Sequence, residues 1–171
     1  AGFGIWATHF IAMLAYDPGI AISYNIGVTV LSLLVAMAIT CSGFGVAVYT
    51  TTHWRSAAGG AIVGIGIAAM HYLGISAVEM PGHISWTPSL VIASVVLSVA
   101  FGVVAFEAAK RYKTTLGTSL AALLLTIAIM SHHFTAMGAV EVVSDPSRAF
   151  SQFSITPLTL ALGVAVIALM V

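Results

Sequence analysis

Long apolar runs separated by short polar or Pro/Gly-containing breaks dominate the chain. About 20 consecutive apolar residues cross the hydrocarbon core of a bilayer as a helix, and several of these runs reach that length. The breaks include DPG at 17–19, TTHWRS at 51–56 and KRYKTT at 110–115. The pattern predicts six helices, at residues 3–16, 22–50, 57–80, 88–109, 116–143 and 155–171.

The composition indicates that these helices lie in lipid. Apolar residues make up 60% of the 171 positions and charged residues only 6%, with a mean hydropathy of +1.12. In a soluble domain, about a quarter of the residues are charged. This chain has too few charged residues to cover a surface that faces water. The predicted fold class is therefore all-α, a polytopic membrane helix bundle that forms a single domain over residues 1–171.

The two ends of the sequence suggest a fragment of a longer chain. The first predicted helix is too short to span a bilayer and is not preceded by Met, and the last run reaches Val171 without a polar flank. We expect a seventh helix before Ala1. One cysteine, Cys41, excludes an internal disulfide framework and a cysteine-cluster metal site. The formal charge is zero with no basic tract, which argues against nucleic acid as a partner.

Charged residues divide between the two ends of the predicted bundle. Four of the five basic residues follow the second and fourth helices, and the positive-inside tendency makes that side cytoplasmic. We expect Glu107, near the same side, to pair with Lys110 or Arg111. Most acids fall on the opposite side, which would face out of the cytoplasm. Four of the five basic residues lie on the first side, Arg55, Lys110, Arg111 and Lys113, and the acids on the other side are Asp17, Glu79, Glu141 and Asp145. Arg148 is the one basic residue on the acidic side.

One phrase occurs three times along the chain, and each copy contains a histidine. The copies are GIWATHFIAMLAYD, GIAAMHYLGISAVE and AIMSHHFTAMGAVE, which start at residues 4, 66 and 128. Their histidines, His9, His71 and His133, are therefore 62 residues apart (71 − 9 and 133 − 71). An aromatic residue follows each histidine, and an acid stands eight residues further on. This period predicts three copies of a two-helix unit.

The repeat predicts that the three imidazoles lie at one depth inside the membrane. Each acid lies about 12 Å beyond its histidine along the predicted helix, toward the outer end. Small residues recur beside the histidines and would allow the helices to approach closely. Ionisable groups inside membranes are rare and usually functional. We therefore expect His9, His71 and His133 to converge on one point and bind a ligand there.

The chemistry of the neighbouring residues favours a metal ion. Imidazole suits Cu, Zn, Fe and Ni, and thioether sulfur favours Cu(I). Copper is the first choice and zinc the second, while haem remains open because paired histidines on facing helices can ligate it. The candidate ligands are His9, His71, His133, His132, Met13, Met70 and Met137. The acids Asp17, Glu79 and Glu141 either mark helix ends or orient the imidazoles from a second coordination sphere.

Three classes of function follow from these residues. A membrane sensor would bind a ligand at the metal and shift the packing of its helices. An intramembrane zinc hydrolase would act on a lipid amide or ester, but the symmetric repeat offers three equivalent acids and singles out no general base. A metal carrier or a structural bundle is the third class, and a carrier should show polar residues through the whole depth. The sensor is favoured.

The motifs also resemble those of the MHYT family, a bacterial membrane module. MHYLGI, with THFIAM and HHFTAM as its partners, carries the resemblance over essentially the whole chain, and GFGIW is similar to the segment before the family's first motif. The resemblance pairs His9 with Met13, His71 with Met70, and His133 with Met137. Thr8 and His132 stand where the motif has Met, and Ile75 replaces the Met of the second copy.

The resemblance implies a multi-pass protein of the bacterial inner (cytoplasmic) membrane. It implies a copper-binding sensor of O2, CO or NO, which signals to cytoplasmic GGDEF and EAL domains that make and degrade cyclic di-GMP. The implied partners are the lipid bilayer, a diatomic gas and these output domains, and a homodimer is left open. The chain itself would then not be an enzyme.

Overall fold

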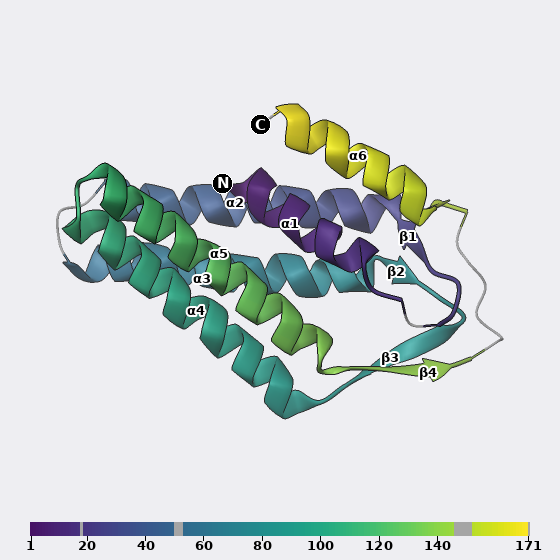
Figure 1. Cartoon of the computed structure of the whole chain (residues 1–171). Helices are drawn as coiled ribbons and strands as arrows, with labels where there is room; N and C mark the ends of the chain where they lie inside the picture. Colours follow the sequence, from purple (N-terminus) through teal and green to yellow (C-terminus); the bar gives the residue numbers. More distant parts are fainter. Residues whose placement is uncertain (18, 50–52, 146–151, 171) are drawn as a thin grey trace.

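The computed structural model is a bundle of helices with short strands gathered at one end (Figure 1). It describes residues 1–17, 19–49, 53–145 and 152–170. The helices are α1 (Gly2–Leu14), α2 (Ile26–Val48), α3 (His53–Ser76), α4 (Pro88–Arg111), α5 (Thr115–Met137) and α6 (Pro157–Met170). The strands are β1 (Ser23–Asn25), β2 (Val78–Glu79), β3 (Gly82–Trp86), β4 (Val140–Ser144) and β5 (Ser154–Ile155).

The predicted all-α membrane bundle is confirmed. Within the described residues, α2, α3, α4 and α5 are each long and apolar enough to cross a bilayer, so this is a multi-pass membrane protein. The helices α1 and α6, of 13 and 14 residues, reach only about 20 Å, which is less than the hydrocarbon thickness of about 30 Å. In sequence order, α2 packs on α3, α3 on α4 and α4 on α5, while α1 lies against α2 and α6 (Figure 1).

Two helices were predicted too long at the ends that the strands follow. The helices expected at 57–80 and 116–143 end at Ser76 and Met137, because the residues that follow enter strands β2 and β4. These strands contain β-branched residues that pair with segments distant in sequence, which a continuous apolar run cannot reveal. At the other end, α3 begins at His53, so the polar break predicted at 51–56 is shorter; residues 51 and 52 lie outside the described part.

The strand pairs connect successive repeats. In the antiparallel pair β1–β2, Ser23 lies opposite Glu79, and in the pair β3–β4, Ser85 lies opposite Glu141. The two serines are 62 residues apart (85 − 23), and so are the two glutamates (141 − 79). Strand β2, which follows the histidine-bearing helix α3, therefore pairs with β1, which precedes α2 of the first repeat. In the same way β4, which follows α5, pairs with β3, which precedes α4 of the second repeat. Strand β5 pairs with the other edge of β1.

Polar residues fix several helix ends. The side chain of Asn25 accepts a hydrogen bond from Val28 N (3.2 Å) at the start of α2, and Thr114 Oγ1 accepts one from Gly117 N (3.2 Å) in α5. Lys110 and Arg111 occupy the last turn of α4, where positive charge is favoured by the helix dipole. The predicted pairing of Glu107 with Lys110 is wrong, because Lys110 Nζ is buried without a hydrogen-bond partner, as is Glu107 Oε1. A pairing of Glu107 with Arg111 stays a prediction.

Glycines bring α3 into backbone contact with both of its neighbours. Gly60 faces the backbone of Gly102 on α4, and a Cβ on Gly64 would lie only 2.5 Å from Ser98 O on the same helix. On the other side, Gly59 faces Gly43 of α2. Such close approach is the usual role of small residues between membrane helices. It makes α2, α3 and α4 a tightly packed unit.

We expect Gly64→Ala to destabilise the bundle by about 1–3 kcal/mol, the usual cost of overpacking a filled core. The added methyl group forces α3 and α4 apart, since the atom it meets is a backbone oxygen. Gly45→Ala in α2 is the matched control, because nothing lies within 4 Å of its Cβ. Unfolding in detergent measures both variants, and equal stability would contradict the described α3–α4 contact.

Candidate metal centre

Three buried imidazoles lie near the C-terminal ends of the three odd-numbered helices, at the strand-bearing end of the bundle. His9 is on α1, His71 on α3 and His133 on α5, with exposed fractions of 1%, 1% and 4%. Each stands four or five residues before the last residue of its helix, Leu14, Ser76 or Met137. The three side chains thus come from equivalent places in three helices, as the 62-residue period predicts.

The Nδ1 atoms of these rings point toward one another. His9 Nδ1 lies 3.1 Å from His71 Nδ1 and 3.3 Å from His133 Nδ1. One ligand atom from each ring lies within 4.8 Å of the other two. We call His9, His71 and His133 the histidine cluster. Two nitrogens at about 2.0–2.1 Å from a metal with tetrahedral or trigonal angles are about 3.3–3.6 Å apart, so the histidine cluster could hold a metal ion.

Hydrogen bonding alone does not satisfy this arrangement. A neutral imidazole nitrogen either donates or accepts, in one direction within the ring plane, yet His9 Nδ1 faces two other Nδ1 atoms. A cation at the centre would instead receive a lone pair from each ring. The opposite nitrogens, Nε2 of His9 and of His71, are buried without a hydrogen-bond partner. A Cβ on Gly74 would lie 2.5 Å from His9 Nε2, so the α3 backbone holds that ring in place.

The candidate methionines lie in the apolar core around the histidine cluster. Met13 and Met70 are buried and Met137 is half-buried. Met13 and Met137 each stand one helical turn beyond a cluster histidine, on the same helix face. Tyr24 OH in β1 donates to Met13 O (3.4 Å), and burial raises the pKa of Tyr24 to about 12, which keeps its phenol neutral. A ligand role for the thioethers stays a prediction.

His132 lies beside the histidine cluster and has a different environment. Its Nδ1 donates to Ser94 O (2.9 Å), which leaves Nε2 as an acceptor, buried and without a partner. Its ring centroid is 4.9 Å from that of His71 at an interplanar angle of 85°. The group of mutually close ligand atoms among the described residues does not include His132. Its role as a further ligand stays a prediction.

Two serines near the site were missed by the sequence analysis. Ser32 Oγ accepts a hydrogen bond from Trp6 Nε1 (3.0 Å), and Tyr72 OH lies 2.8 Å from Ser94 Oγ. Both serines are fully buried, and both hydroxyls donate to a carbonyl of their own helix. They are also 62 residues apart (94 − 32), so the histidine period could have identified them. They anchor the aromatic residues that pack beside the imidazoles.

The three repeated acids lie in strands and turns beyond the helix ends. Glu79 in β2 accepts hydrogen bonds from Asn25 Nδ2 (3.1 Å) and Ser154 Oγ. Glu141 in β4 lies 3.5 Å from Thr87 Oγ1, and Asp17 accepts from Gly19 N (2.8 Å). The bonds of Glu79 link β2 to β1 and to β5. A second-sphere role toward the imidazoles stays a prediction.

Fold and site together define a polytopic membrane protein with a buried histidine cluster suited to a metal ion. A family model described as a bacterial signalling protein N-terminal repeat matches residues 2–60 and 64–122. The chain belongs to this family, the MHYT family. The two matched segments begin 62 residues apart (64 − 2), which is the period of the histidines. The third motif, at 128–141, lies beyond the matched residues.

Several bacterial signalling proteins are similar to this chain. A signalling protein of Caulobacter vibrioides is 38% identical over 165 residues, which cover 95% of this chain and 20% of the relative. In Pseudomonas aeruginosa, the cyclic di-GMP phosphodiesterase NbdA is 35% identical (95% of this chain, 22% of the relative). The bifunctional diguanylate cyclase/cyclic di-GMP phosphodiesterase MucR is also 35% identical (82% and 21%). The chain spans about a fifth of the length of these relatives. No solved structure matches it.

Proposed function

We propose that residues 1–171 form one sensory input domain in the bacterial inner membrane, which binds a metal ion through the histidine cluster. The observation that carries this proposal is the convergence of three buried Nδ1 atoms from separate helices. Desolvating three imidazoles is costly, and ionisable groups at such depth are usually functional. The family's signalling role agrees with a site that reports on conditions at or within the membrane.

Copper is the proposed ion, with zinc as the alternative. Imidazole binds both, and the thioethers of Met13, Met70 and Met137 favour Cu(I) if they complete the coordination. Haem fits less well. Its two axial histidines need the macrocycle between them, whereas each imidazole of the histidine cluster has its ring centroid within 5.3 Å of the other two. A bare ion is therefore favoured.

The sensing step follows from where the histidines stand. Copper, when bound, supplies a redox-active centre that could take O2, CO or NO. The chain's own part is to hold the three Nδ1 atoms on α1, α3 and α5, so that a change in their preferred separation acts on three helices at once. A ligand shifts a conformational equilibrium only by its differential affinity for the two packings.

We propose that the signal passes to a cytoplasmic output that makes or degrades cyclic di-GMP, through fused or associated GGDEF and EAL domains. Two of the similar Pseudomonas proteins carry names with these activities. In this proposal, the described residues supply no catalytic group, and Asp17, Glu79 and Glu141 support the outer layer and the imidazoles.

The test is metal analysis of the full-length protein purified from membranes, followed by assay of its cyclic di-GMP activities. We expect about one equivalent of copper per chain, no Soret band, and an output that changes when O2, CO or NO is supplied. One equivalent of zinc with turnover of a lipid amide or ester would instead support the hydrolase. Absence of stoichiometric metal after loading with either ion would overturn the proposal.

A further inference from the structure

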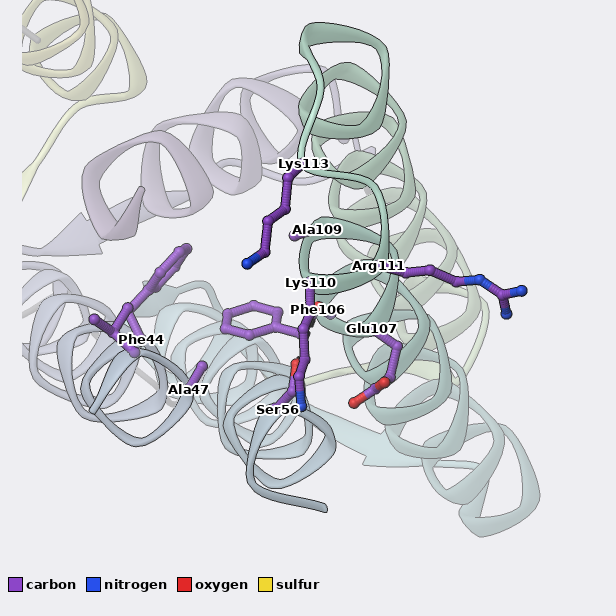
Figure 2. Close-up of a pocket in the computed structure, with 10 residues that line it drawn as sticks. Phe44, Ala47, Ser56, Phe106, Glu107, Ala109, Lys110, Arg111 and Lys113 are labelled. Carbon is purple, nitrogen blue, oxygen red and sulfur yellow. Dashed lines mark hydrogen bonds between the residues drawn. The ribbon is translucent and has the colours of Figure 1, made fainter. Parts of the chain in front are cut away.

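A cavity of about 880 Å³ opens at the end of the bundle opposite the strands, among α2, α3 and α4 (Figure 2). Its volume lies within the range of about 300–1,000 Å³ that is typical of small-molecule sites. Phe44 and Phe106 form an apolar wall, with ring centroids 4.8 Å apart. Glu107, Lys110, Arg111 and Lys113 add charge to the lining. The cavity is therefore amphipathic and is separate from the histidine cluster.

Two side chains of opposite charge, Glu107 and Lys110, line this cavity without a hydrogen bond between Glu107 Oε1 and Lys110 Nζ. Glu107 Oε1 and Lys110 Nζ are both buried, and neither has a hydrogen-bond partner. Figure 2 shows the two side chains extending in the same direction, toward Ser56, while Lys113 extends toward the aromatic wall. Buried charged groups without partners are costly. A ligand that carries both an anion and a hydrogen-bonding cation would satisfy both groups.

The position of the cavity points to a lipid. It lies where α2 and α4 end, the depth at which headgroups meet a spanning helix, and basic pockets between membrane helices bind lipid phosphates. Four basic residues stand at this end (Arg55, Lys110, Arg111 and Lys113) against one acid, Glu107. Phe44 and Val48 are exposed at the rim, where an acyl chain could lie along α2.

We propose that this cavity binds the headgroup of an ethanolamine phospholipid. Lys110 and Lys113 would contact the phosphodiester, Glu107 would accept hydrogen bonds from the primary ammonium, and an acyl chain would pack on Phe44. This assignment does not depend on the metal centre. It predicts that phosphatidylethanolamine binds more tightly than phosphatidylcholine, whose methylated amine donates no hydrogen bond. It also predicts tighter binding than for phosphatidylglycerol, which carries no cation for the Glu107 carboxylate.

The test measures binding of the three phospholipids, with identical acyl chains, to the purified full-length protein by native mass spectrometry. Phosphatidylethanolamine should bind about fivefold or more tightly than the other two, and Glu107→Gln should remove this preference. Lys113→Gln should weaken binding of all three about fivefold, the effect of one basic residue near a membrane surface. Arg111→Gln is the matched control, because Arg111 borders the cavity but its guanidinium turns away from it in Figure 2 and lies over Tyr112.

Equal binding of phosphatidylethanolamine and phosphatidylcholine to the unsubstituted protein would overturn the proposal, as would tightest binding of phosphatidylglycerol. So would an Arg111→Gln effect as large as that of Lys113→Gln. Lys113 lies in an exposed loop, so its substitution should leave helical content unchanged. A measurement without substitutions adds a second test: a photoreactive acyl chain on phosphatidylethanolamine should label the segments around Phe44 and Phe106. Labelling only elsewhere would contradict the assignment.

Discussion

His71→Ala should lower the affinity for copper by more than about 100-fold. Loss of a hydrogen-bond partner behind a metal ligand already costs about 10–100-fold, and this substitution removes a ligand itself. His71 stands on α3, at the centre of the bundle, and its Nδ1 lies 3.1 Å from that of His9. Competition with a chelator of known affinity measures the loss. His9→Ala and His133→Ala should behave in the same way.

The control for these variants is His83→Ala. His83 is exposed in β3 and lies outside the histidine cluster, so its loss should change the affinity for copper by less than about twofold. Helical content and detergent unfolding should be followed for every variant, since a buried cavity is itself destabilising. If His71→Ala stays folded and retains wild-type affinity, the ion does not bind at the cluster.

Gly74→Ala should lower metal affinity about 10–100-fold without removing any ligand. The new methyl group would stand 2.5 Å from His9 Nε2, which is closer than atoms of folded proteins approach, so the ring must move. The movement displaces Nδ1 from its place opposite His71 and His133. Coordination bonds tolerate only about 0.2 Å of error in length. The chelator competition used for the histidine variants measures the effect.

Gly4→Ala is the matched substitution for this prediction. Gly4 is on α1, the helix of His9, and nothing lies within 4 Å of its Cβ, so affinity should be unchanged. If Gly74→Ala binds metal as tightly as Gly4→Ala, the ring of His9 is free to adjust. The described packing of His9 against the α3 backbone would then be wrong.

The sequence predicted the meeting of the three imidazoles because it depends on the repeat. A constant spacing of 62 residues places His9, His71 and His133 at equivalent points of equivalent helices, whatever the detailed packing. It could not predict that Nδ1, and not Nε2, faces the centre. That choice depends on side-chain rotation, which for His9 is restricted by the close backbone of Gly74.

The strands were missed for a different reason. Segments of two to five residues, such as Val78–Glu79 and Val140–Ser144, have too few positions for a periodic pattern. Their structure comes from pairing with segments more than fifty residues away, as for Ser23 with Glu79. Glu107 was also misjudged, because its proximity to Lys110 in sequence suggested a contact that the cavity between α2, α3 and α4 does not contain.

The strand pairing has a mechanical consequence for signalling. Backbone hydrogen bonds between β1 and β2, and between β3 and β4, fasten the histidine-bearing end of the bundle and make it a pivot. A helix of 24 residues such as α3 is about 36 Å long, so a tilt of about 2° at the pivot moves its far end by about 1 Å. Small displacements beside the imidazoles would thus become larger displacements at the opposite surface, with the helices as lever arms.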